Sequence, residues 1–319
     1  MLLYKLLTGA LVASLFLAVT CQDTGTNPGE PDPETTTTTG ENAYGIFRLM
    51  IDQDANSTSF SGALKNGPEP ESPWKSVMKS GQLELLEPEH PFCENCGING
   101  LCVAEDSCSP KPTSITGGTV SVTGVVLTNG TTSFTSKPIV KFYSTAASFA
   151  DPPFEANSTI TLSAEAGPDA EAFTMSAAGV ERINLLNDTV KLNDGEPINL
   201  SWTPPSVAGT TVMHIEVDIS YHGGTKAIII GDCDDNGTLK IPGEMLDKLV
   251  SYGLSGFPKI TMTRRAVSPV TGSAKAQLIV EATRQVGITV PGLISCNPGP
   301  DDGCPEGYTC TDDRRCVSE

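Results

Sequence analysis

The sequence lacks the residues from which most hydrolytic and group-transfer active sites are built. It has three histidines in 319 residues, and no Ser or Cys stands in a recognisable nucleophile elbow. It also contains no glycine-rich phosphate loop and no His-Glu-x-x-His zinc motif. We therefore expect a protein that is not an enzyme and that needs no cofactor, with calcium as the single exception considered below.

Positive charge is also scarce. Lys and Arg number 20 against 38 Asp and Glu, which gives a net charge of −18. Such a surface repels phosphate backbones, so nucleic acid is excluded as a partner. Aromatic residues make up only 6% of the chain, but a hydrophobic content of 38% is enough for β-sandwich cores. Beyond the N-terminus no apolar run approaches the roughly 18 residues expected of a membrane span.

The N-terminus has the pattern of a bacterial lipoprotein signal. Lys5 supplies a positive charge, and residues 6–19 form an apolar run too short to span a bilayer comfortably. The run Leu17–Cys21 resembles a lipobox, in which the cysteine thiol receives diacylglycerol before cleavage. We predict lipidation of Cys21; the alternative is an ordinary signal peptide that is cleaved nearby.

A tether follows the proposed anchor. Residues 22–42 contain three prolines, several glycines and the run Thr35–Thr39, with no bulky apolar side chain. Such a composition cannot bury a core, so we expect a disordered linker that holds the rest of the chain away from a membrane surface.

The ten cysteines form two groups of four and two single residues. Behind a signal peptide the compartment is oxidising, so each group predicts two internal disulfides, whereas a cytosolic protein would suggest zinc. Sequence does not choose among the three connectivities that each group allows. Acylation of Cys21 would leave Cys233 as the one cysteine outside the predicted disulfides, which we then expect to be buried. Without acylation, Cys233 could pair with Cys21. The predicted disulfide cysteines are Cys93, Cys96, Cys102, Cys108, Cys296, Cys304, Cys310 and Cys316.

The rest of the chain has the pattern of an all-β protein. Short runs rich in β-branched residues recur between Gly, Pro, Asn and Asp, and only residues 243–252 have the apolar spacing of a helix. We predict one or more immunoglobulin-like β-sandwiches with two small disulfide-rich modules, one short helix and a disordered N-terminal tether. The predicted strands lie at 44–52, 119–125, 138–143, 158–163, 172–176, 198–202, 212–221, 227–230, 259–263 and 275–282.

These patterns divide the chain into six segments. They are a signal peptide, a linker with the lipid attachment site, an N-terminal β segment that includes the first four-cysteine module at 93–108, two sandwich parts and a C-terminal four-cysteine module. In the same order they cover residues 1–20, 21–42, 43–114, 115–190, 191–292 and 293–319.

Two segments resemble known families. Residues 199–205, Asn-Leu-Ser-Trp-Thr-Pro-Pro, resemble the second strand of fibronectin type III domains, which places Trp202 in a sandwich core. The C-terminal Cys-Pro-x-Gly-Tyr-x-Cys of residues 304–310 resembles the disulfide-knotted modules that end many bacterial surface lipoproteins. The order of lipobox, tether, cysteine modules and sandwich is similar to that of surface lipoproteins of the myxobacterial type, which implies a location and an architecture but no activity.

The best candidate metal site is the segment 232–237, Asp-Cys-Asp-Asp-Asn-Gly. Asp232, Asp234 and Asn236 match the first three ligand positions of a calcium loop, whose glycine allows a sharp turn. The closing acid would stand at position 243, which is glycine, and Glu244 comes one residue late. The alternative is a β-hairpin turn in which Asn-Gly supplies the positive φ.

A second candidate set lies on the strand predicted at 212–221. His214, Glu216, Asp218 and Ser220 alternate with apolar residues and therefore face one way. A histidine beside two acids resembles a metal or acid–base site, whereas the alternative is the solvent-facing side of a half-buried strand.

The sequence as a whole predicts an exported, lipid-anchored cell-surface protein with a binding, adhesion or envelope-structural role. Its expected location is the bacterial outer membrane or cell surface, and its expected partner is a surface protein or a glycan. A first alternative is a secreted enzyme or accessory subunit with a divalent-metal site at Asp232–Asn236. A second is a eukaryotic secreted glycoprotein, because Asn-x-Ser/Thr sequons occur at Asn56, Asn129, Asn157, Asn187, Asn199 and Asn236.

Overall fold

The computed structural model describes residues 43–70, 73–187, 190–219, 225–297, 299 and 301–318. The predicted signal peptide, the lipidation site Cys21 and the tether lie outside these residues. Within the described ranges the chain forms 21 strands and one helix, arranged in several sheets. The predicted all-β fold class is confirmed.

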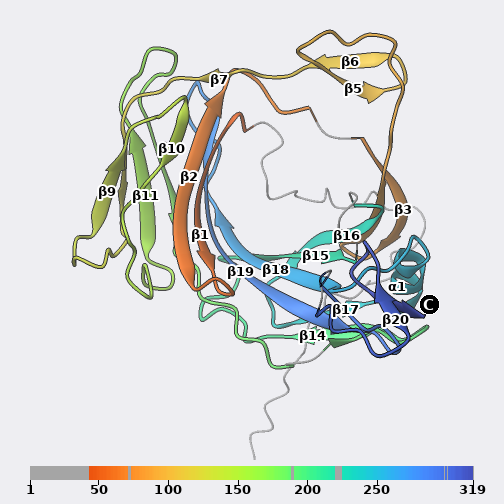
Figure 1. The fold of residues 1–319 in the computed structure, drawn as a ribbon. Coiled ribbons are helices and arrows are strands. Elements are labelled where there is room, and N and C mark those ends of the chain that lie inside the picture. Colours follow the sequence, from red (N-terminus) through yellow and green to blue (C-terminus); the bar gives the residue numbers. More distant parts are fainter. Residues whose placement is uncertain are drawn as a thin grey trace, which may run out of the picture.

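An 11-stranded sheet forms the body of the molecule. Its strands are β1 Gly45–Asp52, β2 Ser57–Lys65, β3 Trp74–Ser80, β4 Leu83–Pro88, β7 Ser114–Ile115, β10 Phe142–Ser144, β13 Val190–Lys191, β15 Val212–Asp218, β16 Ile228–Asp234, β18 Lys259–Val267 and β19 Ala276–Thr289. The strand order is β10-β2-β1-β19-β18-β15-β16-β4-β3, with β7 beside β2 and β13 beside β19. The sheet curves strongly, with β1 and β2 in one arm and β3 in the other (Figure 1).

A smaller sheet covers one arm of the large one and encloses the first hydrophobic core. Its order is β12-β11-β8-β9, with bounds β8 Val120–Thr123, β9 Ser133–Ser136, β11 Thr159–Ala164 and β12 Phe173–Ala178. Alternate residues of β1 point into this core, because successive side chains of a strand face opposite ways. Aromatic rings fill it: Phe47 lies 5.2 Å from Tyr143 and Phe60 lies 5.1 Å from Phe134, measured between ring centroids.

The second core lies behind the other arm of the large sheet. It is covered by the strand pair β14 Ile198–Ser201 and β17 Thr238–Ile241, and by the helix α1 Gly243–Val250. Trp202 is 1% exposed and belongs to this core. Cys233 is also buried there, which is one of the two outcomes expected for it.

The helix α1 follows the predicted signals at its N-terminal end. Pro242 is the N-cap and Glu244 stands in the first turn, where a negative charge favours the helix dipole. Met245, Leu246 and Leu249 are buried in the second core. The helix ends at Val250, two residues before the predicted end, so that Tyr252 lies in the turn beyond it.

Both cysteine groups form the predicted disulfides. Cys93 pairs with Cys102 and Cys96 with Cys108, beside the hairpin of β5 Gly100–Ala104 and β6 Ser107–Pro110. In each module the first cysteine pairs with the third and the second with the fourth. The C-terminal module carries the bonds Cys296–Cys310 and Cys304–Cys316 beside the hairpin of β20 Tyr308–Cys310 and β21 Cys316–Ser318.

The large sheet joins strands from segments that the sequence separates. Strands β1 and β2 come from 43–114, β10 comes from 115–190, and β15, β16, β18 and β19 come from 191–292. Leu83 and Leu85, from the first of these segments, belong to the second core, and β18 and β19 contribute side chains to both cores. Hydrogen-bonded strands therefore cross the predicted segment boundaries.

The strand predicted at 138–143 is mostly a turn. Ile139 bridges to Phe142, and the turn residues Val140 and Lys141 have φ of 50° and 66°. A left-handed conformation costs an L-residue about 1–2 kcal/mol, and two-residue hairpins of this kind prefer Asn-Gly. Regular strand structure is therefore confined to β10.

Replacing the two residues of this turn that have a positive φ is expected to stabilise the protein. The double variant V140N/K141G should raise the free energy of unfolding by about 1–2 kcal/mol, because both residues then tolerate a positive φ. Val140 is 94% exposed, so its replacement loses little packing, and Lys141→Gly gives up one exposed hydrogen bond, from Lys141 Nζ to the Ser114 carbonyl at 2.8 Å. Urea denaturation measures the effect, with Val140→Thr as the control because Thr is also β-branched. Equal stability of the two variants would contradict the prediction.

Candidate ligand-binding site

A cleft of 890 Å³ lies between the hairpin β3–β4, the first disulfide module and the turn after α1. Its volume is within the range of about 300–1,000 Å³ usual for small-molecule sites. The cleft combines a mostly apolar wall with a few polar groups, which is the usual composition of a ligand site. Its apolar wall comprises Pro73, Trp74, Pro88, Pro91, Leu101 and Tyr252.

The hairpin β3–β4 positions Trp74. Gly81 has φ of 55° in the turn that joins the two strands, and Trp74 is paired with Pro88 at the open end of the hairpin. Leu83 and Leu85 point into the second core and so anchor the hairpin. Trp74 itself remains 38% exposed at the rim of the cleft. A large planar ring is thus presented to solvent from a fixed strand.

Polar groups of the cleft meet at Glu87. The hydroxyl of Tyr252 donates to Glu87 Oε2 at 2.6 Å, and Lys75 Nζ donates to Glu87 Oε1 at 3.2 Å. Lys248 Nζ lies 4.9 Å from the centroid of the Tyr252 ring. The hydrogen bond from Tyr252, followed by that from Lys75, lowers the pKa of Glu87. The same bond to Glu87 raises the pKa of Tyr252.

Removing the Tyr252 hydroxyl tests its hydrogen bond to Glu87. In Tyr252→Phe we expect the pKa of Glu87 to rise toward its ordinary value of 4.5, measured by NMR titration. Because the pKa is lowered in the folded state, ionised Glu87 stabilises the fold above its unfolded pKa, and this contribution is lost as the pH falls through the folded pKa. The loss of stability at acid pH should therefore be smaller in Tyr252→Phe than in the wild type. Tyr308→Phe, in the C-terminal module, is the control; an unchanged Glu87 titration in Tyr252→Phe would contradict the assignment.

A second cavity of 920 Å³ adjoins the first. Pro73, Trp74 and Glu89 line both cavities, so Trp74 stands between them. Ser76 and Glu84 come from the hairpin, whereas Val103 and Ser109 come from the disulfide module. Trp74 is therefore within reach of a ligand in either cavity.

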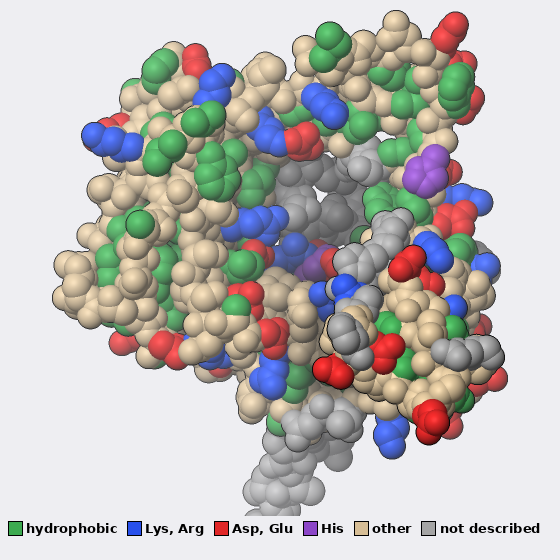
Figure 2. All heavy atoms as spheres, viewed as in Figure 1, with side chains coloured by type: hydrophobic (Ala, Val, Ile, Leu, Met, Phe, Trp, Pro, Cys, Tyr) green, Lys and Arg blue, Asp and Glu red, His purple; other side chains and the backbone are tan. Residues whose placement is uncertain are grey.

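A polar stripe crosses the concave face of the large sheet. Arg48 Nη1 donates to Glu281 Oε2 at 3.0 Å, and Arg265 lies opposite Glu281 in the strand register. Asp232 accepts a hydrogen bond from Arg265 and lies 2.7 Å from His214 Nδ1. Figure 2 shows Lys or Arg, Asp or Glu and His side chains on the wall of the central hollow. The charges of this stripe are paired within the sheet.

The stripe unites two candidate sets that the sequence kept apart. His214, Glu216 and Asp218 alternate with buried Ile215 and Val217, as the half-buried strand predicts. His214 belongs to β15 and Asp232 to the neighbouring β16, and antiparallel pairing places them directly opposite each other. Ser220, the fourth member of the predicted set, lies outside the described residues.

The predicted calcium ligands do not form a compact loop. Asp232 and Asp234 are on β16, and Asn236 Oδ1 accepts from the Thr238 amide at 3.2 Å in the turn that follows. Arg265 and His214 occupy the Asp232 carboxylate, where a cation would have to compete with them. Calcium binding stays a prediction, and thermal melting with millimolar calcium tests it.

The hairpin alternative for the same segment is wrong. Strand β16 pairs with β15 and β4, whereas β17 pairs with β14 in another sheet. Gly237 does adopt a positive φ of 97°. Its turn carries the chain from the large sheet to the strand pair that covers the second core.

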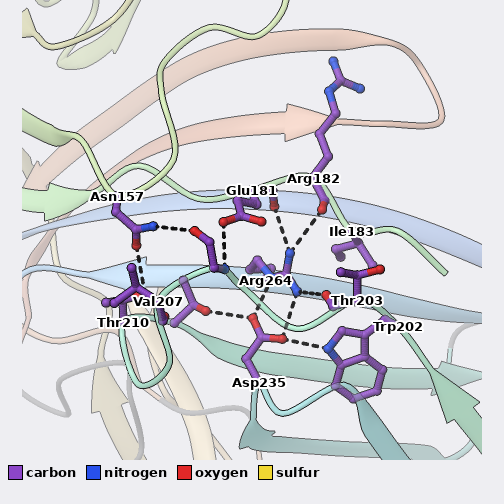
Figure 3. A network of polar contacts seen from close by, with 12 residues as sticks. Asn157, Glu181, Arg182, Ile183, Trp202, Thr203, Val207, Thr210, Asp235 and Arg264 are labelled. Carbon is purple, nitrogen blue, oxygen red and sulfur yellow. Dashed lines mark hydrogen bonds and ion pairs between the residues drawn. The ribbon is translucent and has the colours of Figure 1, made fainter. Parts of the chain in front are cut away.

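Asp235 is the centre of a buried polar network (Figure 3). Its carboxylate accepts from Arg264 Nε at 2.6 Å, Trp202 Nε1 at 2.7 Å and Thr211 Oγ1 at 2.7 Å. Arg264 Nη2 also donates to the carbonyl of Thr203 at 2.8 Å. The network ties β18 to the layer that covers the second core, so we assign it a structural role.

Sequence reasoning missed both the network and the cleft. Arg264 follows Ile260 and Met262 at the alternate positions of β18 that point into the protein. A charged residue at such a position was the one signal in the sequence that pointed to a buried polar network. Trp74 stands among prolines before the first cysteine module, a pattern that specifies no partner for it.

No family model matches the chain, and no curated protein matches it. Among solved structures the chain is similar to the FN1–FN3 domains of chicken CNTN1, with 7% identity over 73% of this chain and 72% of that one. The TM-score is 0.17, so we argue fold and function from the residues of this chain. The four disulfides among the described residues are typical of exported proteins. No helix within the described ranges is long and apolar enough to cross a membrane.

Proposed function

We propose that this protein is an exported, non-catalytic binding protein that is anchored by lipid at Cys21 and presents its ligand site on a tether. The lipobox pattern, the Thr- and Pro-rich linker and the four disulfides support this proposal. The order of these features resembles that of surface lipoproteins of the myxobacterial type. The proposed location is the bacterial cell surface or outer membrane.

The observation that carries the proposal is the cleft around Trp74. An exposed indole lies beside prolines and beside a carboxylate held by Tyr252 and Lys75. A ligand would bind by covering the apolar wall and by hydrogen bonding to the polar rim. One wall carries the Cys93–Cys102 bond, which keeps a small module ordered without a hydrophobic core of its own.

Intact mass of the native protein tests the anchor. Protein extracted from membranes should begin at Cys21 and carry the mass of diacylglycerol. Alkylation should reach eight further cysteines only after reduction. A soluble species that carries glycan mass would instead identify the protein as a secreted glycoprotein.

Binding to printed glycan and peptide arrays tests the cleft. We expect ligands that are retained by the wild type and lost by Trp74→Ala. Phe142→Ala is the matched control, because Phe142 is 48% exposed on β10, away from the cleft. Equal binding by Trp74→Ala and the wild type would show that this cleft is not the ligand site.

A further inference from the structure

We infer that the cleft around Trp74 takes a neutral, linear oligosaccharide whose sugar rings stack on the indole. This inference rests on the proposed function and specifies its ligand class. Three observations carry it: the exposed aromatic ring, a polar lining without a surplus of positive charge, and a second cavity that Trp74 also lines.

The exposed indole fits the apolar face of a sugar ring. Trp74 lies at the start of β3 and is 38% exposed, while Tyr252 lines the same cleft. Burying a large aromatic ring releases water from an extensive apolar surface, and its planar shape selects a flat partner. Pro73, Pro88 and Pro91 extend this apolar wall without adding amide donors.

The polar lining offers donors as well as acceptors, because Ser76, Thr225 and Lys226 line the cavities together with the carboxylates. Glu84, Glu87 and Glu89 line the two cavities, and an ionised carboxylate only accepts hydrogen bonds. Sugar hydroxyls donate as well as accept. A proline-rich peptide would also suit an aromatic groove, but its proline nitrogens carry no hydrogen. The lining therefore favours a polyhydroxylated ligand.

Charge favours a neutral sugar over an acidic one. Glu84 is paired with Lys79, and Glu87 is paired with Lys75. Lys226 and Glu89 add one charge of each sign, so the lining has no surplus of positive charge for an acidic ligand. The whole chain carries a net charge of −18. A uronic acid polymer would find no surplus of positive charge in the lining and would be repelled by the acidic surface.

The shape favours a linear chain of several rings. Cavities of 890 Å³ and 920 Å³ meet at Trp74, so a ligand that occupies both must pass the indole. The lining comes from the fixed hairpin β3–β4 on one side and from the disulfide module on the other, with Leu101 in the first cavity and Val103 in the second.

Tryptophan fluorescence gives a direct test, because the chain has only two tryptophans and Trp202 is 1% exposed. The full chain is titrated with cellohexaose, chitohexaose, a galacturonic acid hexamer and a proline- and arginine-rich peptide. We expect a neutral hexasaccharide to change Trp74 emission. Calorimetry should show that Trp74→Ala weakens its binding by about 10- to 100-fold, whereas Phe142→Ala has no effect.

Each result decides one of the two proposals. Saturable binding of a neutral hexasaccharide that depends on Trp74 supports the ligand class. Binding of only the peptide or the acidic hexamer at Trp74 overturns the ligand class and leaves the proposed function standing. Absence of hexasaccharide binding at millimolar concentration also overturns the ligand class. The proposed function fails only when no array ligand depends on Trp74. Trp74→Phe keeps a planar ring and should retain most of the affinity, which separates stacking from a folding defect.

Discussion

Replacing Asp235 with alanine is expected to lower the free energy of unfolding by about 3–5 kcal/mol, because it leaves a buried guanidinium without its counter-charge. Arg264 is 1% exposed, and two of its nitrogens donate to the Asp235 carboxylate. The indole of Trp202 and the hydroxyl of Thr211 lose the same acceptor. Chemical denaturation measures this loss of stability, with the fluorescence of Trp202 as the signal for unfolding.

A double-mutant cycle separates the ion pair from the packing. Arg264→Met leaves the buried Asp235 carboxylate without its counter-charge and should also be strongly destabilising. The variant R264M/D235A removes both charges, so we expect it to lose less stability than the sum of the losses in Arg264→Met and Asp235→Ala. Additive losses would show that the two side chains act independently, contrary to the geometry of Figure 3.

Removing the bond Cys96–Cys108 is expected to unfold the first module and to open the cleft. The module is too small to hold itself together, and a cross-link over a loop of this length contributes about 3 kcal/mol in the chain-entropy model. The variant C96S/C108S should therefore exchange amide hydrogens rapidly through β5 and β6. It should also bind array ligands weakly, because Leu101 and Cys102 form part of the cleft wall.

The C-terminal module supplies a matched control. Cys304–Cys316 spans the same sequence separation of 12 residues as Cys96–Cys108. We expect C304S/C316S to loosen its own module by a similar amount while leaving Trp74 emission and ligand binding unchanged. Loss of binding in both variants would mean that general instability, and not the cleft wall, explains the effect.

Local patterns were enough to predict the elements of the fold. The alternation in residues 212–221 predicted a half-buried strand, and β15 has that alternation. Apolar spacing with Pro242 at the start predicted α1. The counts and spacing of cysteines predicted two modules, each with two disulfides. Each of these signals lies within a few residues of chain, where period and turn chemistry determine the outcome.

The sequence by itself determined the all-β class, the two disulfide modules, the short helix and the acidic surface. The tertiary structure alone decided the disulfide connectivity, the pairing of β17 with β14, and the buried ion pair between Arg264 and Asp235. It also decided the cleft, whose Tyr252–Glu87 bond joins residues 165 positions apart. The reason is physical: strand period and cysteine spacing are local, whereas these contacts depend on how a curved sheet brings distant strands and loops together.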